Sequence, residues 1–364
     1  KTHIKLKTCS DTELLARYLA GNMGSSTAEG IVRCMNDIEG AYSVVGLRSD
    51  GELFAFRDPL GIRPLCLGAS RDGTVTAVSS ETVGLDINSL DVIGDVEPGE
   101  AVIFSKESVE RQRLVKCNKR AFCGFEFSYF ARPDSIINGR TVYSVREEFG
   151  RNLGRKYQEI VRDADVIISI PETADDAAYG LHEETGLRWE RGLRRHRYVT
   201  QRAFILESDD RSSTIDRKIN VVNGSLRGKR VIVVEDSIVR GDTTKTIIKK
   251  LRERGAEKVY MFVTFPRITH PCFYGIDMAT FTELIGFSYD EAGIAKQIGA
   301  DAVCFQSIDD YVRATGMQGK DLCMACACGK YPTELAQKIA DRSRNVVSTD
   351  RNRIYEKANL NQEA

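Results

Sequence analysis

The chain has 364 residues, 42% hydrophobic and 29% charged, and its 52 lysine and arginine residues balance 52 aspartate and glutamate residues. This composition excludes a disordered or fibrous protein, and the zero net charge gives no electrostatic reason to expect binding to nucleic acid or to an anionic membrane surface. No apolar run approaches the roughly 18 residues of a membrane-spanning helix, and residues 1–7 are not followed by the apolar core of a signal peptide. The length predicts about two domains.

Residues 1–116 have the pattern of a β-rich domain with one early helix. The capping sequence Ser10-Asp11-Thr12-Glu13 predicts a helix over residues 13–20. Short strand-like runs follow, and turn sequences such as Asp72-Gly73 and Pro98-Gly99 separate them. The predicted strands cover residues 41–47, 53–56, 75–78 and 100–104. This pattern indicates antiparallel pairing.

Residues 117–342 show a different pattern, in which strands and helices alternate. Residues 142–162 have helical periodicity, and the alternation that follows predicts a parallel sheet flanked by helices. The predicted strands are 164–171, 229–235, 258–264 and 302–306, and the predicted helices are 175–185, 244–254, 290–298 and 309–314. The polar segment 201–226 breaks the alternation and is expected to be either a functional lid or disordered. Residues 343–364 form a polar C-terminal tail.

The most informative motif lies at the end of a predicted parallel strand. Four apolar residues, 231–234, are followed by Glu235 and Asp236 and then by a short loop with Gly241 and two threonines that opens a helix. Ligands of open α/β sheets bind at the carboxyl ends of strands, and N–H groups at a helix N-terminus suit a phosphate. Two carboxylates at the strand end suit a pair of sugar hydroxyls, with or without Mg²⁺. The structural alternative is an acidic strand end followed by a capping threonine.

A second motif is the pair Cys323 and Cys326, among ten cysteines in the chain. This spacing lets two thiolates bind one metal centre, and by itself it fits a zinc site, an iron–sulfur cluster or a redox pair.

The strand-end motif resembles the phosphoribosyl pyrophosphate (PRPP) loop of type I phosphoribosyltransferases. Further segments extend the resemblance to the amidophosphoribosyltransferase family: Phe127–Ser135, Leu193–Phe204, Cys272–Asp277, Cys323–Cys326 and Tyr331–Glu334. Arg57–Leu65 and Ser80–Thr82 are similar to a class II glutaminase domain. The resemblance implies an α+β domain over residues 1–116, a partial Ntn-hydrolase (class II glutaminase) domain. An α/β phosphoribosyltransferase domain with a parallel sheet and the iron–sulfur cysteines follows over residues 117–342.

The resemblance also implies an activity. Members of this family are pentosyltransferases that make 5-phosphoribosylamine, glutamate and pyrophosphate from PRPP, glutamine and water, the first step of de novo purine biosynthesis. The implied substrate-binding residues are Asp11 for the glutamine α-amine, Glu172 and Thr173 for pyrophosphate, Arg197 and Tyr198 in a loop that closes over PRPP, Glu235 and Asp236 for the ribose hydroxyls and Mg²⁺, and Ser237, Arg240, Gly241, Thr243 and Thr244 for the 5-phosphate.

Some family members carry a structural [4Fe–4S] cluster, whose four ligands would here be Cys123, Cys272, Cys323 and Cys326. A zinc site with the same ligands, or reduced thiols, are the alternatives. The family further implies a homotetramer, purine nucleotides as feedback inhibitors and a cytoplasmic location.

The sequence departs from the family pattern in two places. Carboxylates stand at Glu172, Asp175, Asp176 and Asp242, so a divergent paralogue or a PRPP- or nucleotide-binding regulator without turnover is the alternative function. The chain begins with Lys1, whereas glutaminases of this class use an N-terminal cysteine as the nucleophile. We therefore expect this chain to be an N-terminally truncated form that uses free ammonia rather than glutamine.

Overall fold

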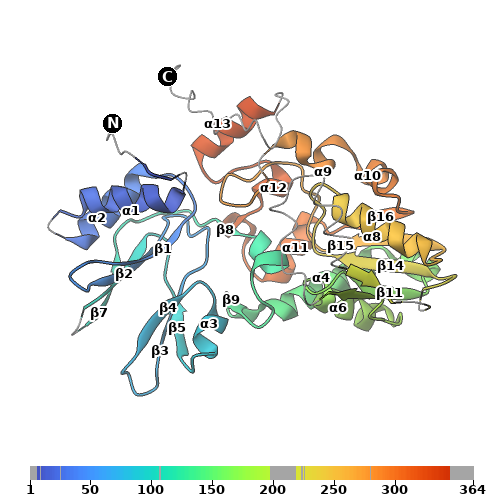
Figure 1. The fold of residues 1–364 in the computed structure, drawn as a ribbon, viewed down its shortest axis with the longest axis horizontal. Helices are drawn as coiled ribbons and strands as arrows, with labels where there is room; N and C mark the ends of the chain where they lie inside the picture. Colours follow the sequence, from blue (N-terminus) through green and yellow to red (C-terminus); the bar gives the residue numbers. More distant parts are fainter. Residues whose placement is uncertain are drawn as a thin grey trace. The chain divides into compact units, whose positions relative to one another are not determined.

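The structure is a computed structural model in which the chain forms two compact units, residues 1–123 with 320–323 and residues 124–319 with 324–364. Each unit is described by itself, and Figure 1 shows the helices and strands of both. Among the described residues, no helix has the length and apolar character needed to cross a bilayer. The described residues are 6–8, 10–24, 26–105, 108–196, 219–222, 224, 226–278 and 280–344.

The first unit contains two antiparallel sheets and two N-terminal helices. One sheet has the order β1-β2-β6-β7 and the other the order β4-β3-β5. The helices are α1 (Asp11–Asn22), α2 (Thr27–Asp37) and the short α3 (Thr82–Asp86). The strands are β1 (Ser43–Leu47), β2 (Leu53–Arg57), β3 (Cys66–Ala69), β4 (Thr76–Ser79), β5 (Asp91–Asp95), β6 (Glu100–Phe104), β7 (Val109–Arg113), and the parallel pair β8 (Phe122–Cys123) and β17 (Leu322–Cys323).

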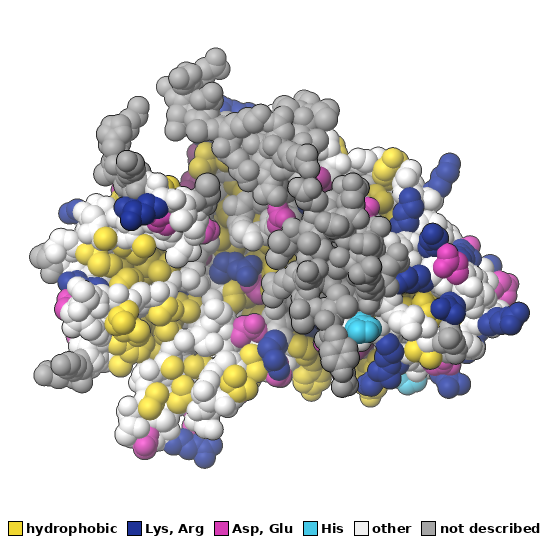
Figure 2. All heavy atoms as spheres, in the orientation of Figure 1, with side chains coloured by type: hydrophobic (Ala, Val, Ile, Leu, Met, Phe, Trp, Pro, Cys, Tyr) yellow, Lys and Arg dark blue, Asp and Glu magenta, His cyan; other side chains and the backbone are white. Residues whose placement is uncertain are grey.

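The side chains of β2 alternate between two hydrophobic clusters. Phe54 and Phe56 pack with residues of α1 and α2 such as Ile31, whereas Ala55 packs with Leu67 of the second sheet. Successive strand residues point to opposite faces, so β2 is buried on both sides. In Figure 2, hydrophobic side chains gather on the visible face of this unit. The exposed large hydrophobic residues of the unit include Val45 and Leu47 of β1 and Ile87 after α3.

The second unit is built on a parallel sheet with the order β11-β14-β15-β16. Val231 and Val233 of β14 pack into one hydrophobic cluster, and Ile232 and Val234 pack into another. Because helices cover both faces, β14 is a continuous apolar run rather than an alternating one. The strands are β11 (Val166–Ser169), β14 (Arg230–Glu235), β15 (Lys258–Val263) and β16 (Ala302–Phe305); α8 (Asp242–Glu253) and α10 (Glu291–Ile298) cover one face, and α4 (Val142–Lys156) and α6 (Asp175–Thr185) the other.

The direction in which the chain adds strands reverses between β11 and β14. After β11, the chain passes through α6 to Trp189, which pairs in parallel with Ile167 of β11. After β14, the chain passes through α8 to β15, on the side of β14 away from β11. In open α/β sheets, ligands bind outside the carboxyl ends of the strands at this kind of reversal. The topology therefore places a ligand site at the ends of β11 and β14.

The remaining elements of the second unit are short or peripheral. They are the π-helix η1 (Glu126–Phe130), β9 (Ile136–Ile137), β10 (Arg140–Thr141), α5 (Gln158–Asp163), β12 (Leu193–Arg195), β13 (Ile219–Val221), η3 (Phe281–Glu283), α9 (Ile285–Ser288), α11 (Ile308–Thr315), α12 (Ala325–Cys328) and α13 (Glu334–Ser343). The short helix η4 (Gly319–Asp321) begins at the last residue of the segment 124–319, and its other two residues belong to the first unit, where it leads into β17.

The alternating strands and helices predicted after residue 163 are confirmed, with no end shifted by more than two residues. The helical stretch predicted over 142–162 is two helices, because the backbone at Tyr157 leaves the helical region with ψ at 44°. Of the segment predicted as a lid or disordered, residues 201–218 lie outside the described residues, and residues 219–221 form β13, which pairs with β12. The tail beyond residue 344 also lies outside them.

Helices α4 and α6 approach each other closely at two glycines. A Cβ atom on Gly150 would lie 1.8 Å from the carbonyl oxygen of Ala177, and one on Gly180 would lie 2.0 Å from the carbonyl oxygen of Glu147. No real side chain fits at such distances, so the two backbones would have to separate. Because α6 follows directly from the loop after β11, this contact also fixes that loop relative to α4.

We expect Gly150→Ala to lower the free energy of unfolding of the second unit by about 2 kcal/mol, because overpacking a helix contact costs about 1–3 kcal/mol. Trp189, the single tryptophan of the chain, lies in this unit, so urea unfolding followed by its fluorescence measures the change. Gly21→Ala in α1 is the control, because a Cβ atom there meets nothing within 4 Å. It should leave the Trp189 transition unchanged, and an equal effect of both substitutions would contradict the close-contact argument.

Candidate active site at the ends of two parallel strands

The two loops predicted to bind PRPP lie at the same edge of the sheet. Strands β11 and β14 are parallel neighbours, and Ser169 pairs with Val234 near their carboxyl ends. The loop 170–174 follows β11 and leads into α6, and its peptide bond between Pro171 and Glu172 is cis. The loop 236–241 follows β14 and leads into α8. Segments about 65 positions apart in the sequence therefore meet because their strands are adjacent.

Asp236 links the two loops through its carboxylate, which is buried with its residue 6% exposed. Its Oδ2 atom accepts a hydrogen bond from the Thr173 hydroxyl at 2.5 Å. Its Oδ1 atom accepts one from the Ser237 hydroxyl at 2.6 Å. Three residues that the sequence predicts to bind PRPP are thus joined by hydrogen bonds to the Asp236 carboxylate, and both oxygens of that carboxylate have a donor.

Glu235 is buried beside Asp236. The backbone carbonyl of Glu235 accepts from the N–H of Thr264 at 3.0 Å, and that of Asp236 accepts from the N–H of Phe265 at 2.8 Å. These bonds continue the pairing of β14 with β15 and fix the backbone under both acids. Burial raises the pKa of Glu235 well above its usual range, and the nearby charge of Asp236 raises it further. Burial also raises the pKa of Asp236, against the hydrogen bonds from Ser237 and Thr173 and the charge of Arg146.

The predicted phosphate loop opens helix α8. Gly241 has φ +89° and is the N-cap residue of the helix, a backbone conformation that a glycine adopts without strain. The first-turn N–H groups of a helix have no partner within the helix and point out of its N-terminus. Thr244 is buried, Thr243 is half-buried and Asp242 is exposed. The loop thus offers backbone donors and hydroxyls, the groups that suit a phosphate.

Arg240, also predicted to contact the phosphate, forms an ion pair with Glu283 of η3 at 3.1 Å. Both side chains are only 12% exposed. The pair joins the loop after β14 to the segment before α9, so Arg240 positions this loop as well as carrying charge.

The other acids of the loop after β11 stand at the start of α6. Asp175 accepts a hydrogen bond from the hydroxyl of Ser169, and an Oδ atom of Asp176 lies 3.9 Å from the Arg146 guanidinium. Burial raises the pKa of Asp175 above its usual range, and it raises the pKa of Asp176 to about 6, with the Arg146 charge opposing the second shift. Glu172 is exposed.

The sequence analysis did not identify Arg146 as part of this site. Arg146 is 2% exposed on the buried face of α4, and its guanidinium donates to the carbonyls of Phe127 and Ala131 at 2.7 Å each. A buried arginine needs such acceptors, and here its charge lies close to the site acids. The only signal in the sequence is a charged residue within the apolar stripe of a predicted helix.

Of the remaining predicted residues, one lies in the first unit and two are outside the described part of the chain. Asp11 belongs to the first unit, where it is exposed at the start of α1 and accepts the N–H of Thr12 at 2.7 Å. Arg197 and Tyr198 lie outside the described residues.

Each unit brings together two of the four predicted cluster cysteines. In the first unit, Cys123 and Cys323 are direct partners in the β8–β17 ladder. In the second unit, the carbonyl of Cys326 accepts the N–H groups of Thr269 and His270, which are three and two residues before Cys272. Among the residues with described positions, no three His, Cys, Asp or Glu side chains form a group that could hold a metal ion.

Asp176 provides a test of the electrostatics. Its pKa is raised from 3.8 to about 6, so the folded protein favours the protonated acid and loses stability as pH rises from about 4 to about 6. The uncharged isostere in Asp176→Asn removes this loss. We expect its stabilising effect in urea unfolding to be about 2 kcal/mol larger at pH 8 than at pH 4.5. The control Glu159→Gln, at an exposed position on α5, should show no such difference, and the same effect of Asp176→Asn at both pH values would contradict the assignment.

Comparison with known proteins identifies relatives over most of the chain. Residues 1–86 match a family described as a glutamine amidotransferase domain. The amidophosphoribosyltransferase of Bacillus subtilis is 38% identical over 91% of this chain and 69% of the relative. That of Methanocaldococcus jannaschii is 39% identical over 94% of this chain and 74% of the relative.

Solved structures agree with these relatives. The PRPP amidotransferase of B. subtilis, complexed with ADP and GMP, superposes with a TM-score of 0.82 at 36% identity and covers 92% of this chain and 73% of that one. A structure described as the allosteric regulatory enzyme of purine biosynthesis has the same TM-score and identity, covering 91% and 71%. The predicted fold class, a glutaminase-type domain followed by a phosphoribosyltransferase domain with a parallel sheet, is confirmed. The chain belongs to the amidophosphoribosyltransferase family.

Proposed function

We propose that this protein is an amidophosphoribosyltransferase, which makes 5-phosphoribosylamine, glutamate and pyrophosphate from PRPP, glutamine and water in the first step of de novo purine biosynthesis. The observation that carries the proposal is the hydrogen-bonded group of Thr173, Asp236 and Ser237 at the ends of β11 and β14. Family membership favours this activity over a paralogue or a nucleotide-binding regulator without turnover.

The reaction at this site is a displacement at C1 of PRPP. The nitrogen of ammonia forms a bond to C1 and then loses a proton, while the bond from C1 to the pyrophosphate oxygen breaks and its electron pair leaves with pyrophosphate. In the full reaction, hydrolysis of the glutamine amide supplies the ammonia. The contribution of the protein is to hold the sugar in one orientation and to stabilise the charge that develops.

The residues at the two strand ends divide this work. Glu235 and Asp236 accept hydrogen bonds from the ribose hydroxyls, which supply donors to carboxylates that burial has removed from water. The N-terminus of α8, with Thr243 and Thr244, binds the 5-phosphate. The loop that contains Thr173 faces the pyrophosphate. Glu235 and Asp236 are the residues that would hold a Mg²⁺ ion, which would neutralise the charge of the departing pyrophosphate.

The acidic departures from the family pattern are compatible with this arrangement. Asp242 is exposed at the first position of α8, where a carboxylate is favoured by the helix dipole. Asp175 accepts a hydroxyl donor from Ser169, and Asp176 lies beside the Arg146 guanidinium. The carboxylates of Asp175 and Asp176 thus each have a neighbouring group that stabilises a negative charge.

The direct test supplies PRPP and Mg²⁺ with an ammonium salt or glutamine and measures pyrophosphate release. We expect release by the wild-type chain and a roughly 100-fold lower kcat/KM in Asp236→Asn, because the amide keeps the size of the side chain but loses the negative charge. Glu159→Gln, at an exposed position on α5, should retain wild-type activity. A folded chain that binds PRPP and releases no pyrophosphate with either nitrogen source would contradict the proposed function.

We also propose that Cys123, Cys272, Cys323 and Cys326 hold a structural [4Fe–4S] cluster. Four thiols are the donor set that such clusters require, and the pairing of Cys123 with Cys323 and the position of Cys326 beside the 269–272 segment support it. A cluster on these ligands would tie together four separate stretches of the chain. Zinc on the same cysteines is the alternative.

Metal and sulfide analysis of anaerobically purified protein tests the cluster. We expect a brown protein with iron and acid-labile sulfide, and loss of both in Cys326→Ser. Cys328→Ser is the matched control, because Cys328 lies two residues away on the same short helix and is exposed. Zinc in place of iron, or iron that persists in Cys326→Ser, would contradict the assignment.

We further propose that the protein forms a homotetramer, acts in the cytoplasm and is inhibited by purine nucleotides. The B. subtilis structure complexed with ADP and GMP supports nucleotide binding. The buried cysteines Cys34, Cys66 and Cys304 are free thiols, which is typical of a reducing compartment.

A further inference from the structure

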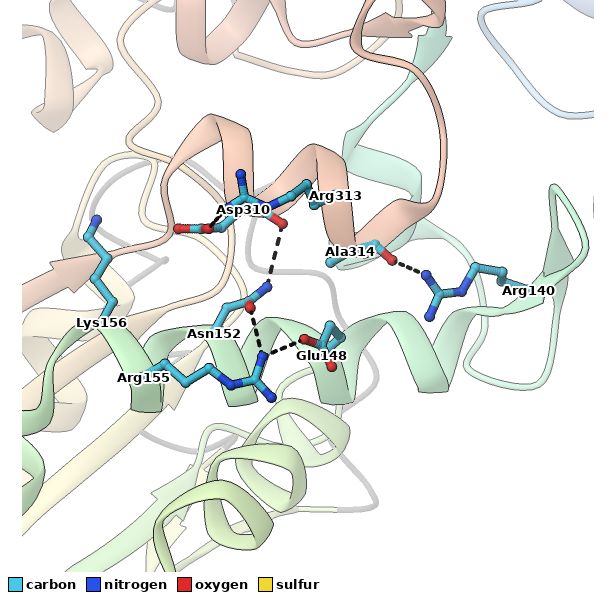
Figure 3. A pocket seen from close by; sticks show the side chains of 8 residues that line it. All are labelled: Arg140, Glu148, Asn152, Arg155, Lys156, Asp310, Arg313 and Ala314. Carbon is cyan, nitrogen blue, oxygen red and sulfur yellow. Dashed lines mark hydrogen bonds and ion pairs between the residues drawn. The ribbon is translucent and has the colours of Figure 1, made fainter.

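A cavity of about 590 Å³ is lined by residues of α4, α11 and β10. Figure 3 shows that helices α4 and α11 line it, with Arg140 of β10 at one end and Lys156 at the other. Asn152 spans the two helices, because its side-chain amide donates to the carbonyl of Asp310 at 3.5 Å. The volume is within the range of small-molecule sites, about 300–1,000 Å³. Residues of the PRPP-binding loops are not among those that line it.

Positive charge predominates in this cavity. Four cationic side chains line it against two carboxylates. Both carboxylates are already paired: Glu148 lies 2.9 Å from Arg155, and Asp310 forms an ion pair with Arg313. Arg155 has a further partner in Glu184, at 2.8 Å. The acids of the cavity are therefore engaged by two of its four cations.

The other two cations, Arg140 and Lys156, bond only to backbone carbonyls and an aromatic ring within the described part of the chain. Arg140 donates one N–H to the carbonyl of Ala314 at 2.7 Å. Lys156 donates to the carbonyl of Phe305 at 3.1 Å and lies 4.8 Å from the centre of the Tyr157 ring. A guanidinium has five N–H donors and an ammonium has three. Each therefore keeps its charge and several donors for a ligand.

The Arg140 side chain is also held in place. Its Cδ atom lies against Gly316, where an added Cβ atom would be 3.1 Å away, and the bond to Ala314 fixes the guanidinium at the end of α11. A guanidinium fixed in this way loses less conformational freedom when it binds an anion.

We propose that this cavity binds a small phosphorylated metabolite with at least two anionic groups, contacted by Arg140 at one end and Lys156 at the other. Arginine and lysine are the side chains that form charge-assisted hydrogen bonds to phosphate oxygens. Between the two ends of the cavity, the carboxylates and their cations are paired with each other. The electrostatic attraction for an anion is therefore strongest at Arg140 and Lys156, so an anion with two separated charges fits better than a compact one. This site is separate from the PRPP site of the proposed function.

Two experiments on the whole chain test the site. In the first, crystals of the wild-type protein are soaked with tungstate, a phosphate-like oxyanion whose metal is located by anomalous scattering. We expect a peak in the cavity beside Arg140 or Lys156. Peaks confined to the loop after β14, or no peak, would overturn the proposal, and this experiment does not depend on the folding of any variant.

In the second experiment, fructose 1,6-bisphosphate, whose two phosphates are held apart by a sugar, is titrated calorimetrically into three proteins. The double variant Arg140→Gln with Lys156→Gln removes both cations and keeps a donor for each backbone carbonyl. The double variant Lys249→Gln with Arg254→Gln removes the same charge from exposed positions on and just after α8. Binding at the PRPP loops is common to all three proteins. We expect the cavity variant to lose one binding equivalent, or to bind it at least about tenfold more weakly, and the control to match the wild type. Equal binding by all three would overturn the proposal.

Discussion

The hydrogen bond from Thr173 to Asp236 is the constraint on which the candidate active site depends. Asp236 is almost fully buried at a strand end, and a carboxylate in such a place needs donors for both of its oxygens. Thr173 supplies one from the loop after the neighbouring strand β11, and Ser237 supplies the other. The loop after β11 and the loop after β14 are therefore held in one relative position before any substrate binds, which reduces the ordering required on binding.

That position is supported by contacts behind the loops. The close backbone approach at Gly150 and Gly180 fixes α6 against α4, and Arg146 of α4 bonds to the carbonyls of Phe127 and Ala131 while lying close to Asp176. Glu283 holds Arg240 on the other side of the same edge. The site thus combines a rigid parallel sheet with buried charges that have partners, and a loss of either backbone packing or charge pairing would shift the same two loops.

The sequence predicts this site unevenly, for physical reasons. The motif from Glu235 to Thr244 is local, because one strand, one loop and one helix start contain it, and the predicted elements are confirmed. The hydrogen bond between Thr173 and Asp236 is not local, and it can be predicted only once β11 and β14 are known to be neighbours.

Arg146 was missed because its role depends on carbonyls 15 and 19 residues away. Helix α2 was also missed, although Ser26 and Glu29 have the spacing of a capping box and the Ser26 hydroxyl accepts the N–H of Glu29, so here a local signal was overlooked. The cavity between α4 and α11 joins side chains more than 150 positions apart, such as Asn152 and Asp310, so no sequence window contains it.

The two candidate ligand sites of the second unit have opposite charge, and this difference determines how each responds to an anion. At the strand ends, Glu235 and Asp236 are buried and their pKa values are raised. Because two carboxylates stand there, a polyanion is attracted only when it brings cations with it or when it presents hydroxyl donors to them. Such partners stabilise the ionised carboxylates, so binding should lower these pKa values and substrate affinity should increase with pH. Arg140 and Lys156 bond to backbone carbonyls and have no carboxylate partner among the described residues, so the anion proposed there needs no accompanying cation. Under the proposed function, anion binding at the strand ends requires Mg²⁺, whereas the proposed anion binding in the cavity does not, so we expect dependence on Mg²⁺ to distinguish the two sites.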